Sequence, residues 1–371
     1  MNHSVTWTEK TRDGLARRGT LHTRHGDVAT PAFMPVGTRG SVKTLDSRDL
    51  TDVGAEMVLA NTYHLMERPG EATVAALGEL HGFMAWDGPI LTDSGGYQVF
   101  SLSPKVNEDG VIFKSSYDGS RVELTPERAV AVQETLGSDV AMILDELVGL
   151  PAPRATVEAA MERTLRWSER AVRSRTRSDV SLFGIIQGGV EPDLRAESAS
   201  RTAELDVAGF GIGGFSVGEG LPERNLALDA TVKELPAERV RYVMGLGDTE
   251  GILDAIERGC DLFDCVLPTR LARHGKALTA DGDFGIKRAE WTRDLRPLDD
   301  GCSCLTCARY SRGHLRHLAV TKEPSVQRLL SIHNLTYTLD LMAEVRSAIE
   351  EGTFAELRSV RRNRRVSRNP Q

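Results

Sequence analysis

The stretch from Cys260 to Lys276 combines carboxylates, a strand-breaking proline and a run of cations. Its first half is an apolar run that contains Asp261 and Asp264. A buried strand accommodates an acid at a large cost unless the acid is paired or lies at a strand end. A carboxylate at the end of a strand, beside a cationic loop, suits chemistry on a polyanion, although a capping Asp with a solvated loop is the simpler interpretation of this stretch alone. After Pro268, which ends the strand, the polar and cationic residues are Thr269, Arg270, Arg273, His274 and Lys276.

Three thiols form a second reactive group, because Cys302, Cys304 and Cys307 lie close together in the chain. Little periodic structure surrounds them, and a long helix is predicted over 325–351. Three thiolates and one imidazole make a closed tetrahedral set, which is typical of structural zinc and leaves no position open for a substrate. We expect the fourth ligand to be His333, which lies in the predicted helix, and the competing candidates are His314 and His317.

The composition is that of an ordinary globular protein of 371 residues, 40% hydrophobic and 27% charged. No apolar run reaches the length of about 18 residues that a membrane span requires, and the first residues do not form a signal-peptide pattern. The five Cys, an odd number that all follow residue 259, argue against a disulfide framework and for a reducing compartment, the cytoplasm. Two of them, Cys260 and Cys265, are predicted to be buried packing residues.

The charge is unevenly distributed along the chain. The net charge of −7 gives no overall indication of a nucleic-acid partner. Residues 270–322, however, hold eleven Lys and Arg against six Asp and Glu. After Glu356 come six Arg and no acid, and this tail is either a disordered segment or an RNA contact.

Apolar runs that alternate with helical patterns predict the architecture. In the segment 154–174, for example, Val157, Met161 and Leu165 fall on one helical stripe. The apolar runs give eight candidate strands, and helical segments connect most of them. This pattern favours an α/β fold of the (β/α)8 TIM-barrel type over an open sheet, which would carry a dinucleotide fingerprint. Residues 4–28 are predicted to form a β-hairpin lid before the barrel. The candidate strands are 30–36, 56–61, 89–92, 139–144, 181–186, 207–212, 240–244 and 261–266.

Polar or glycine residues follow most of these strands. The carboxyl ends of all barrel strands meet at one face, where active sites occur. Each residue alone is explained equally well as a helix cap, but a series of such endings on successive strands is not, so we interpret this face as the active site. In strand order from the third to the eighth, the residues are Asp93, Asp145 with Glu146, Gln187, Gly213 with Gly214, Gly245 and Asp264.

Several separated motifs stand out along the chain: Asn61-Thr-Tyr-His-Leu, Asp93-Ser-Gly-Gly-Tyr-Gln-Val-Phe-Ser-Leu, Gly188-Gly189 after Gln187, Gly213-Gly214 with Val217-Gly-Glu219, Phe263-Asp-Cys-Val-Leu-Pro-Thr-Arg, and the thiol group with a later His. With these motifs the sequence resembles the tRNA-guanine transglycosylases, or queuine tRNA-ribosyltransferases, and their bacterial type most closely. The resemblance covers roughly residues 5–355. It implies an insertion-bearing TIM barrel that replaces guanine at the wobble position of G-U-N anticodons (tRNAs for Asp, Asn, His and Tyr) with preQ1, a step in queuosine biosynthesis.

The resemblance also implies roles for particular residues. Exchange of one base for another on the same ribose, with retained configuration, calls for two displacements, and hence for a carboxylate nucleophile and a second acid/base. By resemblance Asp264 is the nucleophile and Asp93 the general acid/base, and a homodimer with one structural Zn²⁺ per chain is implied. The implied base-binding residues are Tyr97, Asp145, Gln187, Gly214, Phe215 and Met244. The implied tRNA contacts are Thr269, Arg270, Arg273 and Lys276, and the implied zinc ligands are Cys302, Cys304, Cys307 and His333.

The chain departs from the family pattern at a few positions. Phe215 stands where Leu is usual, and Leu147 stands where bacterial members commonly carry Cys, so the shape of the base pocket differs. Leu271 replaces the usual Asn, which removes one candidate RNA contact. Val217, in place of the Gly of eukaryotic members, favours preQ1 over the bulkier queuine.

Two other classes of function fit the sequence less well. A non-catalytic RNA-binding subunit of the family would lose one of the two carboxylates, but Asp93 and Asp264 are both present. A metal-dependent barrel hydrolase would need His pairs at strand ends, and His64 is isolated.

The sequence predicts four parts of the chain: an amino-terminal β lid (1–29), the catalytic barrel (30–270), a zinc-binding subdomain with an RNA-contacting loop (271–335), and a final helix with the Arg-rich tail (336–371).

Overall fold

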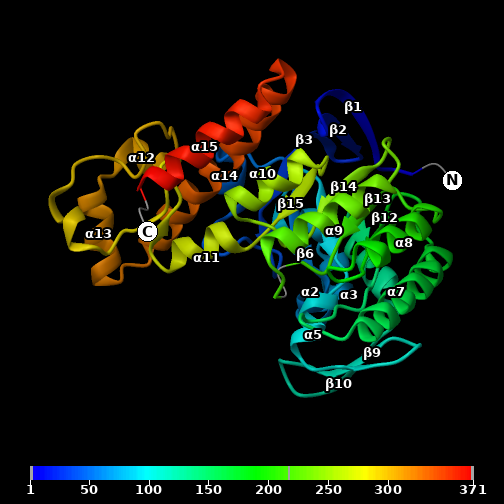
Figure 1. The fold of residues 1–371 in the computed structure, drawn as a ribbon. Coiled ribbons are helices and arrows are strands. Elements are labelled where there is room, and N and C mark those ends of the chain that lie inside the picture. Colours follow the sequence, from blue (N-terminus) through cyan, green and yellow to red (C-terminus); the bar gives the residue numbers. More distant parts are fainter. Residues whose placement is uncertain (1–2, 216–217, 369–371) are drawn as a thin grey trace.

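A closed barrel of parallel strands forms the centre of the computed structural model, which describes residues 3–215 and 218–368 (Figure 1). Strands β4 (Ala32–Met34) and β5 (Val36–Gly37) are two halves of one strand divided at Pro35, since β4 pairs with β15 and β5 pairs with β6. The sheet therefore closes on itself, which confirms the predicted (β/α)8 barrel. The other barrel strands are β6 (Val58–Asn61), β7 (Ile90–Asp93), β11 (Val140–Met142), β12 (Ser181–Ile186), β13 (Gly209–Ile212), β14 (Val240–Val243) and β15 (Leu262–Asp264).

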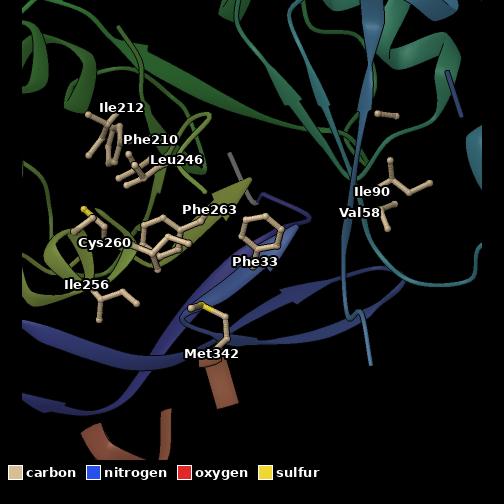
Figure 2. Packing of buried hydrophobic residues seen from close by; sticks show 14 of the residues in the cluster. Phe33, Val58, Ile90, Phe210, Ile212, Leu246, Ile256, Cys260, Phe263 and Met342 are labelled. Carbon is tan, nitrogen blue, oxygen red and sulfur yellow. The ribbon is translucent and has the colours of Figure 1, made fainter. Parts of the chain in front are cut away.

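Side chains alternate along these strands between the barrel interior and the surrounding helices. Met34 and Leu262 belong to the interior cluster, whereas Phe33 and Phe263 are paired across β4 and β15 and point outward. Met342 of a carboxyl-terminal helix packs against the two rings (Figure 2). The helices up to the eighth strand are α1 (Ser47–Asp52), α2 (Thr62–Glu67), α3 (Glu71–Ala76), α4 (Glu79–Met84), α5 (Gly96–Ser101), α6 (Pro126–Leu136), α7 (Arg154–Ser174), α8 (Pro192–Ala203), α9 (Leu221–Lys233) and α10 (Thr249–Glu257).

The predicted lid is a three-stranded antiparallel sheet of β1 (Thr6–Asp13), β2 (Ala16–Thr23) and β3 (Gly26–Thr30). It covers the end of the barrel at which the strands begin, because Leu21 and Val28 join the interior cluster. The lid thus leaves the opposite mouth, where the strands end, uncovered.

A second antiparallel sheet, which the sequence pattern did not reveal, lies beyond the mouth where the strands end. It consists of β8 (Lys105–Val106), β9 (Val111–Lys114) and β10 (Arg121–Leu124). Phe113 of this sheet packs edge-on against Tyr63 of α2. Figure 1 shows the sheet far from β1 and β2.

The segment after β15 is helical, so the prediction of a loop there was wrong. Helix α11 (Leu267–Arg273) has Pro268 in its first turn, where a missing N–H costs nothing. It packs against the long helix α14 (Ser325–Glu351). This helix confirms the one predicted over 325–351. It runs without a break through residue 335, where two of the predicted parts of the chain meet. Between α11 and α14 lie β16 (Lys276–Ala277), β17 (Phe284–Gly285), the 3₁₀ turn η1 (Ala289–Arg293), α12 (Leu305–Arg309) and α13 (Arg312–Thr321).

The Arg-rich tail is also helical as far as Arg368, in α15 (Phe354–Arg368). Arg358 forms ion pairs with Asp254 and Glu257, and Arg361 pairs with Glu344. At least these two of the six arginines are therefore engaged by acids of the same chain. No helix in the described part of the chain has the length and apolar character needed to cross a membrane.

Candidate active site

A cavity of about 320 Å³ opens where the barrel strands end. It is lined by residues from seven of the strand ends and from the helices that follow them, and three carboxylates reach it. The residues predicted from the sequence that line it are Asp93, Tyr97, Asp145, Gly214, Phe215, Met244, Asp264 and Arg270. The predicted catalytic and base-binding residues thus lie around a single cavity, with Gln187 directly behind Asp145.

Asp93 is the last residue of β7 and is held entirely by neutral donors. One carboxylate oxygen accepts hydrogen bonds from the backbone N–H of Thr62 (3.1 Å) and Gly95 (3.0 Å), and the other accepts from the Asn61 side chain (2.5 Å). Burial raises the pKa of Asp93 to about 7 against the effect of these donors, and the negative charge of Asp264 adds to the rise. This carboxyl group therefore exchanges its proton much closer to neutral pH than an exposed Asp does.

Asp264 is the last residue of β15 and shares the cavity with Asp93. A single carboxylate oxygen, Oδ1, accepts two hydrogen bonds, from the Tyr242 hydroxyl (2.5 Å) and from the Gly245 backbone N–H (2.7 Å). Burial raises the pKa of Asp264, and these two donors oppose the rise by stabilising the anion. The second oxygen has no hydrogen bond among the described residues, so it is available to a ligand in the cavity.

Asp145 and Gln187 form a buried pair on the other side of the cavity. The Gln187 amide donates to Asp145 (2.6 Å), and burial raises the pKa of Asp145 to about 6. Glycine is required beside this pair, because a Cβ at Gly96 would lie 2.7 Å from an Asp145 oxygen and one at Gly214, where φ is +75°, would lie 2.5 Å from the Gln187 oxygen.

The remaining pocket positions differ in exposure. The Tyr97 side chain is 62% exposed at the cavity mouth, whereas Phe215 is buried. Leu147, one of the departures noted above, does line the cavity, and Val217 lies outside the described residues. Cys265 also lines the cavity and is only partly buried, so its prediction as a buried residue was wrong, whereas Cys260 is fully buried as predicted.

Helix α11 places a cationic edge beside the cavity. Arg270 is exposed and lines the cavity, Arg273 is partly buried, and Lys276 lies 3.6 Å from Asp283. Thr269, in contrast, is buried, and its hydroxyl donates to the Val266 carbonyl (3.2 Å). Of the cations predicted to meet tRNA, Arg270 and Arg273 therefore lie on α11 and Lys276 lies on β16 just after it, but Thr269 is not at the surface.

The thiol group and His333 come together as one cluster whose ligand atoms all lie within 4.8 Å of one another. The His333 Nδ1 lies 3.3 Å from the Cys307 sulfur and 3.7 Å from the Cys304 sulfur. Its Nε2 lies 2.8 Å from the Leu278 carbonyl, which can only accept, so in the neutral ring the Nδ1 lone pair faces the sulfurs. His314, a competing candidate, stacks on Tyr310 instead. This arrangement fits a metal ion held by Cys302, Cys304, Cys307 and His333.

Comparison with known proteins places this site in a family. The family model described as queuine tRNA-ribosyltransferase matches residues 12–367, nearly the whole chain. The chain belongs to the queuine tRNA-ribosyltransferase family. Similar proteins of that name occur in Herpetosiphon aurantiacus (50% identity, 95% of this chain and 90% of the relative), Gloeobacter violaceus (50%, 96% of each) and Thermus thermophilus (48%, 96% and 93%). The chain is accordingly a glycosyltransferase-type enzyme.

For this family member, the structure adds site residues to which the sequence interpretation gave no role. Tyr242 was overlooked because an aromatic residue in an apolar strand is usually core. Asn61, which donates to Asp93, is the last residue of β6. It could have been found from the sequence in the same way as Asp93, since both are polar residues at a strand end.

Arg195 is a third such residue, a fully buried arginine at the back of the site. It donates to the carbonyls of Gly189 (2.7 Å), Gly213 (2.8 Å) and Ile186 (3.1 Å), and its guanidinium lies 4.4 Å from the centre of the Phe215 ring. Burial lowers its pKa to about 9. Arg195 therefore fastens the turns after β12 and β13, where Gln187 and Gly214 lie.

Proposed function

We propose that this enzyme exchanges guanine at the anticodon wobble position of G-U-N tRNAs for preQ1 through a covalent aspartyl-ribose intermediate, as a step in queuosine biosynthesis. The observation that carries the proposal is the pair of buried carboxylates, Asp93 and Asp264, at the ends of two barrel strands in one cavity. The family membership and the name of its relatives support tRNA as the substrate.

The chemistry follows from the different environments of the two carboxylates. Asp264, stabilised as an anion by Tyr242 and Gly245, attacks C1′ of the ribose with its free oxygen while the bond from C1′ to the guanine nitrogen breaks. Asp93, with its pKa of about 7, gives a proton to the departing guanine and takes one from the incoming base. That base then attacks C1′ and releases Asp264, so the ribose keeps its configuration and no net proton is consumed.

The polar groups around the cavity suit a guanine-like edge. An ionised Asp145 accepts hydrogen bonds from the ring N–H and the exocyclic amino group of such a base, and the Gln187 amide and the backbone N–H groups of Gly214 and Phe215 can donate to its carbonyl. Tyr97 and Met244 line the same cavity and would hold the base between an aromatic and a thioether face.

The cationic edge of α11 suits the phosphates of an anticodon loop. Arg270 stands at the cavity mouth, with Arg273 and Lys276 next along the chain, and we assign these three to the tRNA backbone. Thr269 would act indirectly, because its hydroxyl stays within the first turn of the helix.

We also propose that the Cys302, Cys304, Cys307 and His333 cluster holds one structural Zn²⁺, because three thiolates and an imidazole are its preferred closed set. The zinc-binding part of the chain would form the contact of a homodimer, and exposed Leu295 and Val320 supply apolar surface there. The cytoplasmic location and the four-part division of the chain remain predictions.

Exchange of radiolabelled guanine into an unmodified transcript of tRNA-Asp or tRNA-Tyr tests this function. We expect incorporation by the wild type, competition by unlabelled preQ1, and no incorporation by Asp264→Asn. A complex of enzyme and tRNA that survives denaturing electrophoresis, and that Asp264→Asn does not form, would report the covalent intermediate. Exchange of guanine without competition by preQ1 would mean that the pocket around Leu147 and Phe215 takes another base. Absence of exchange with every transcript would contradict the proposal.

A further inference from the structure

A second group of metal-ligating side chains lies at the opposite end of the barrel, far from the thiol cluster in the chain. It consists of His25, in the turn between β2 and β3, His81 of α4, and Asp139, immediately before β11. One ligand atom from each of the three lies within 4.8 Å of the others. None of these residues belongs to the active-site cavity or to the proposed mechanism.

The three side chains converge on the carboxylate of Asp139, which is fully buried. The His25 Nδ1 lies 2.7 Å from one of its oxygens, and the His81 Nε2 lies 3.3 Å from the other. The two imidazole rings stack at 3.6 Å between centroids, so both present a nitrogen to the same carboxylate.

The Nε2 atom of His81 is the feature of this cluster that suggests a bound cation. This atom is inaccessible to solvent and makes no hydrogen bond within the described part of the chain. In the tautomer that carries its proton on Nδ1, the Nε2 lone pair faces an Asp139 oxygen at 3.3 Å, and a cation between the two atoms would turn this repulsion into two bonds. Zinc–nitrogen and zinc–oxygen bonds of about 2.0 Å place tetrahedral ligand atoms about 3.3 Å apart, the separation found here for His81 and Asp139. The 2.7 Å between His25 and Asp139 is a hydrogen-bond distance, so these two atoms would have to separate when an ion replaces the proton between them.

We propose that His25, His81 and Asp139 bind one divalent transition-metal ion of the zinc, cobalt or nickel type. Two imidazoles and a carboxylate suit these borderline ions better than Mg²⁺ or Ca²⁺, which prefer oxygen ligands. His25 is 28% exposed, so the ion can enter from solvent and a water molecule can complete its coordination.

The surrounding charges allow a cation. Arg24 lies 3.6 Å from Asp139, but it is also bound to Asp179 and to the Gly137 carbonyl. Glu79 and Asp179 offset the charges of Arg24 and Arg177. The ion would join the lid sheet to α4 and to the start of β11, and so hold the amino end of the barrel closed.

Metal stoichiometry of the intact protein tests the site. The full chain is equilibrated with Zn²⁺, or with Co²⁺ after metal removal, gel-filtered and analysed for bound metal by mass spectrometry. We expect two ions per wild-type chain and one per chain in His25→Gln and His81→Gln. The Co²⁺ form reports the two sites separately. Only the thiolate cluster gives thiolate-to-metal charge-transfer absorption; its residues are Cys302, Cys304, Cys307 and His333. The new site, with nitrogen and oxygen ligands, adds only weak bands.

The matched control is His22→Gln, which makes the same change on β2 at an exposed histidine that pairs with Asp27, outside the cluster. It should keep two ions per chain. Added Zn²⁺ should also raise the thermal midpoint of the wild type and of His22→Gln more than that of His81→Gln, because an ion that binds only the folded state stabilises it. A wild-type chain that holds only the thiolate-bound ion, or a second ion retained by both cluster variants, would overturn the proposal. The wild-type result decides the question even if a variant does not fold.

Discussion

The two mouths of the barrel bury the same kind of side chain in opposite ways. At the amino end, Asp261 immediately precedes the eighth strand, β15, and is paired with the Arg17 guanidinium, which donates to both of its oxygens. At the carboxyl end, three residues later, Asp264 is also buried, yet its partners are a hydroxyl and a backbone N–H. One strand thus carries one acid that is neutralised and one that is not.

The same contrast holds at strands β7 and β11 on another side of the barrel. At the amino end, burial opposes ionisation of Asp139, but its contacts with His81 and His25 and the hydrogen bond from the Ile90 backbone outweigh it and lower the pKa. At the carboxyl end, burial prevails and raises the pKa of Asp93 to about 7 and that of Asp145 to about 6. A buried acid with a cationic partner serves the fold, whereas one with only neutral donors is held in a state suited to proton transfer or attack.

The largest expected effect is that of Asp264→Asn on catalysis. The amide cannot act as the proposed nucleophile, so we expect guanine exchange to fall by roughly 10⁴-fold or more. Stability should change little, since the amide oxygen can still accept from Tyr242 and Gly245. Single-turnover exchange with tRNA and urea denaturation measure the two effects. Retention of even a tenth of the activity would exclude Asp264 as nucleophile.

Asp261→Asn makes the same substitution three residues earlier and should act on stability instead. It leaves the buried Arg17 guanidinium without its counter-ion, which costs about 3–5 kcal/mol. Urea denaturation at low temperature measures the loss of unfolding free energy, and the folded fraction should exchange guanine at close to the wild-type rate. If activity fell while stability was unchanged, the assignment of a structural role to acids at the amino end and a catalytic role to acids at the carboxyl end would be wrong.

Tyr242→Phe should have a smaller effect that is confined to chemistry. A hydrogen bond to a charged group contributes about 1.5–3 kcal/mol, which corresponds to a loss of roughly 10- to 150-fold in kcat. Removal of this donor raises the pKa of Asp264 further, so the acid limb of the pH–rate profile, where the nucleophile becomes protonated, should move to higher pH. An unchanged acid limb would show that the hydroxyl does not stabilise the reacting anion.

The smallest effect requires no substitution. Asp93 must carry a proton to release guanine, and burial raises its pKa to about 7. We therefore expect kcat/KM for guanine exchange to fall about tenfold per pH unit above pH 7. Asn61→Ala removes a donor that lowers this pKa and should shift the alkaline limb upward. A flat profile up to about pH 9 would mean that another group donates the proton.

The barrel and the residues at the carboxyl ends of its strands could be predicted from the sequence because both follow from strand periodicity. Polar residues at strand ends must share a face once the strands are parallel, and so Asp93, Asp145 and Asp264 could be grouped by their positions in the chain alone. The roles assigned to them came from the family resemblance. Helix α11 was mistaken for a loop because Pro268 ends a strand and begins a helix equally well.

Partners that are distant in the chain could not be predicted in this way. Arg195 lies in a helix with ordinary polar spacing, and nothing local shows that three carbonyls and the Phe215 ring surround it. The pairing of Asp261 with Arg17 joins residues 244 positions apart in the chain, and the contact of His25 with Asp139 likewise joins the lid to the start of a distant barrel strand.

The divided first strand also determines when the barrel can close during synthesis. Ala32 on β4 pairs with Leu262 on β15, so this seam joins a segment made early on the ribosome to one made late. Until β15 and α14 emerge, Phe33 has neither Phe263 nor Met342 against it. Contacts of such sequence separation form slowly, and an open strand edge invites aggregation. A nascent chain therefore carries an unpaired β4 through much of its synthesis, and this edge is the place where chaperones would be needed most.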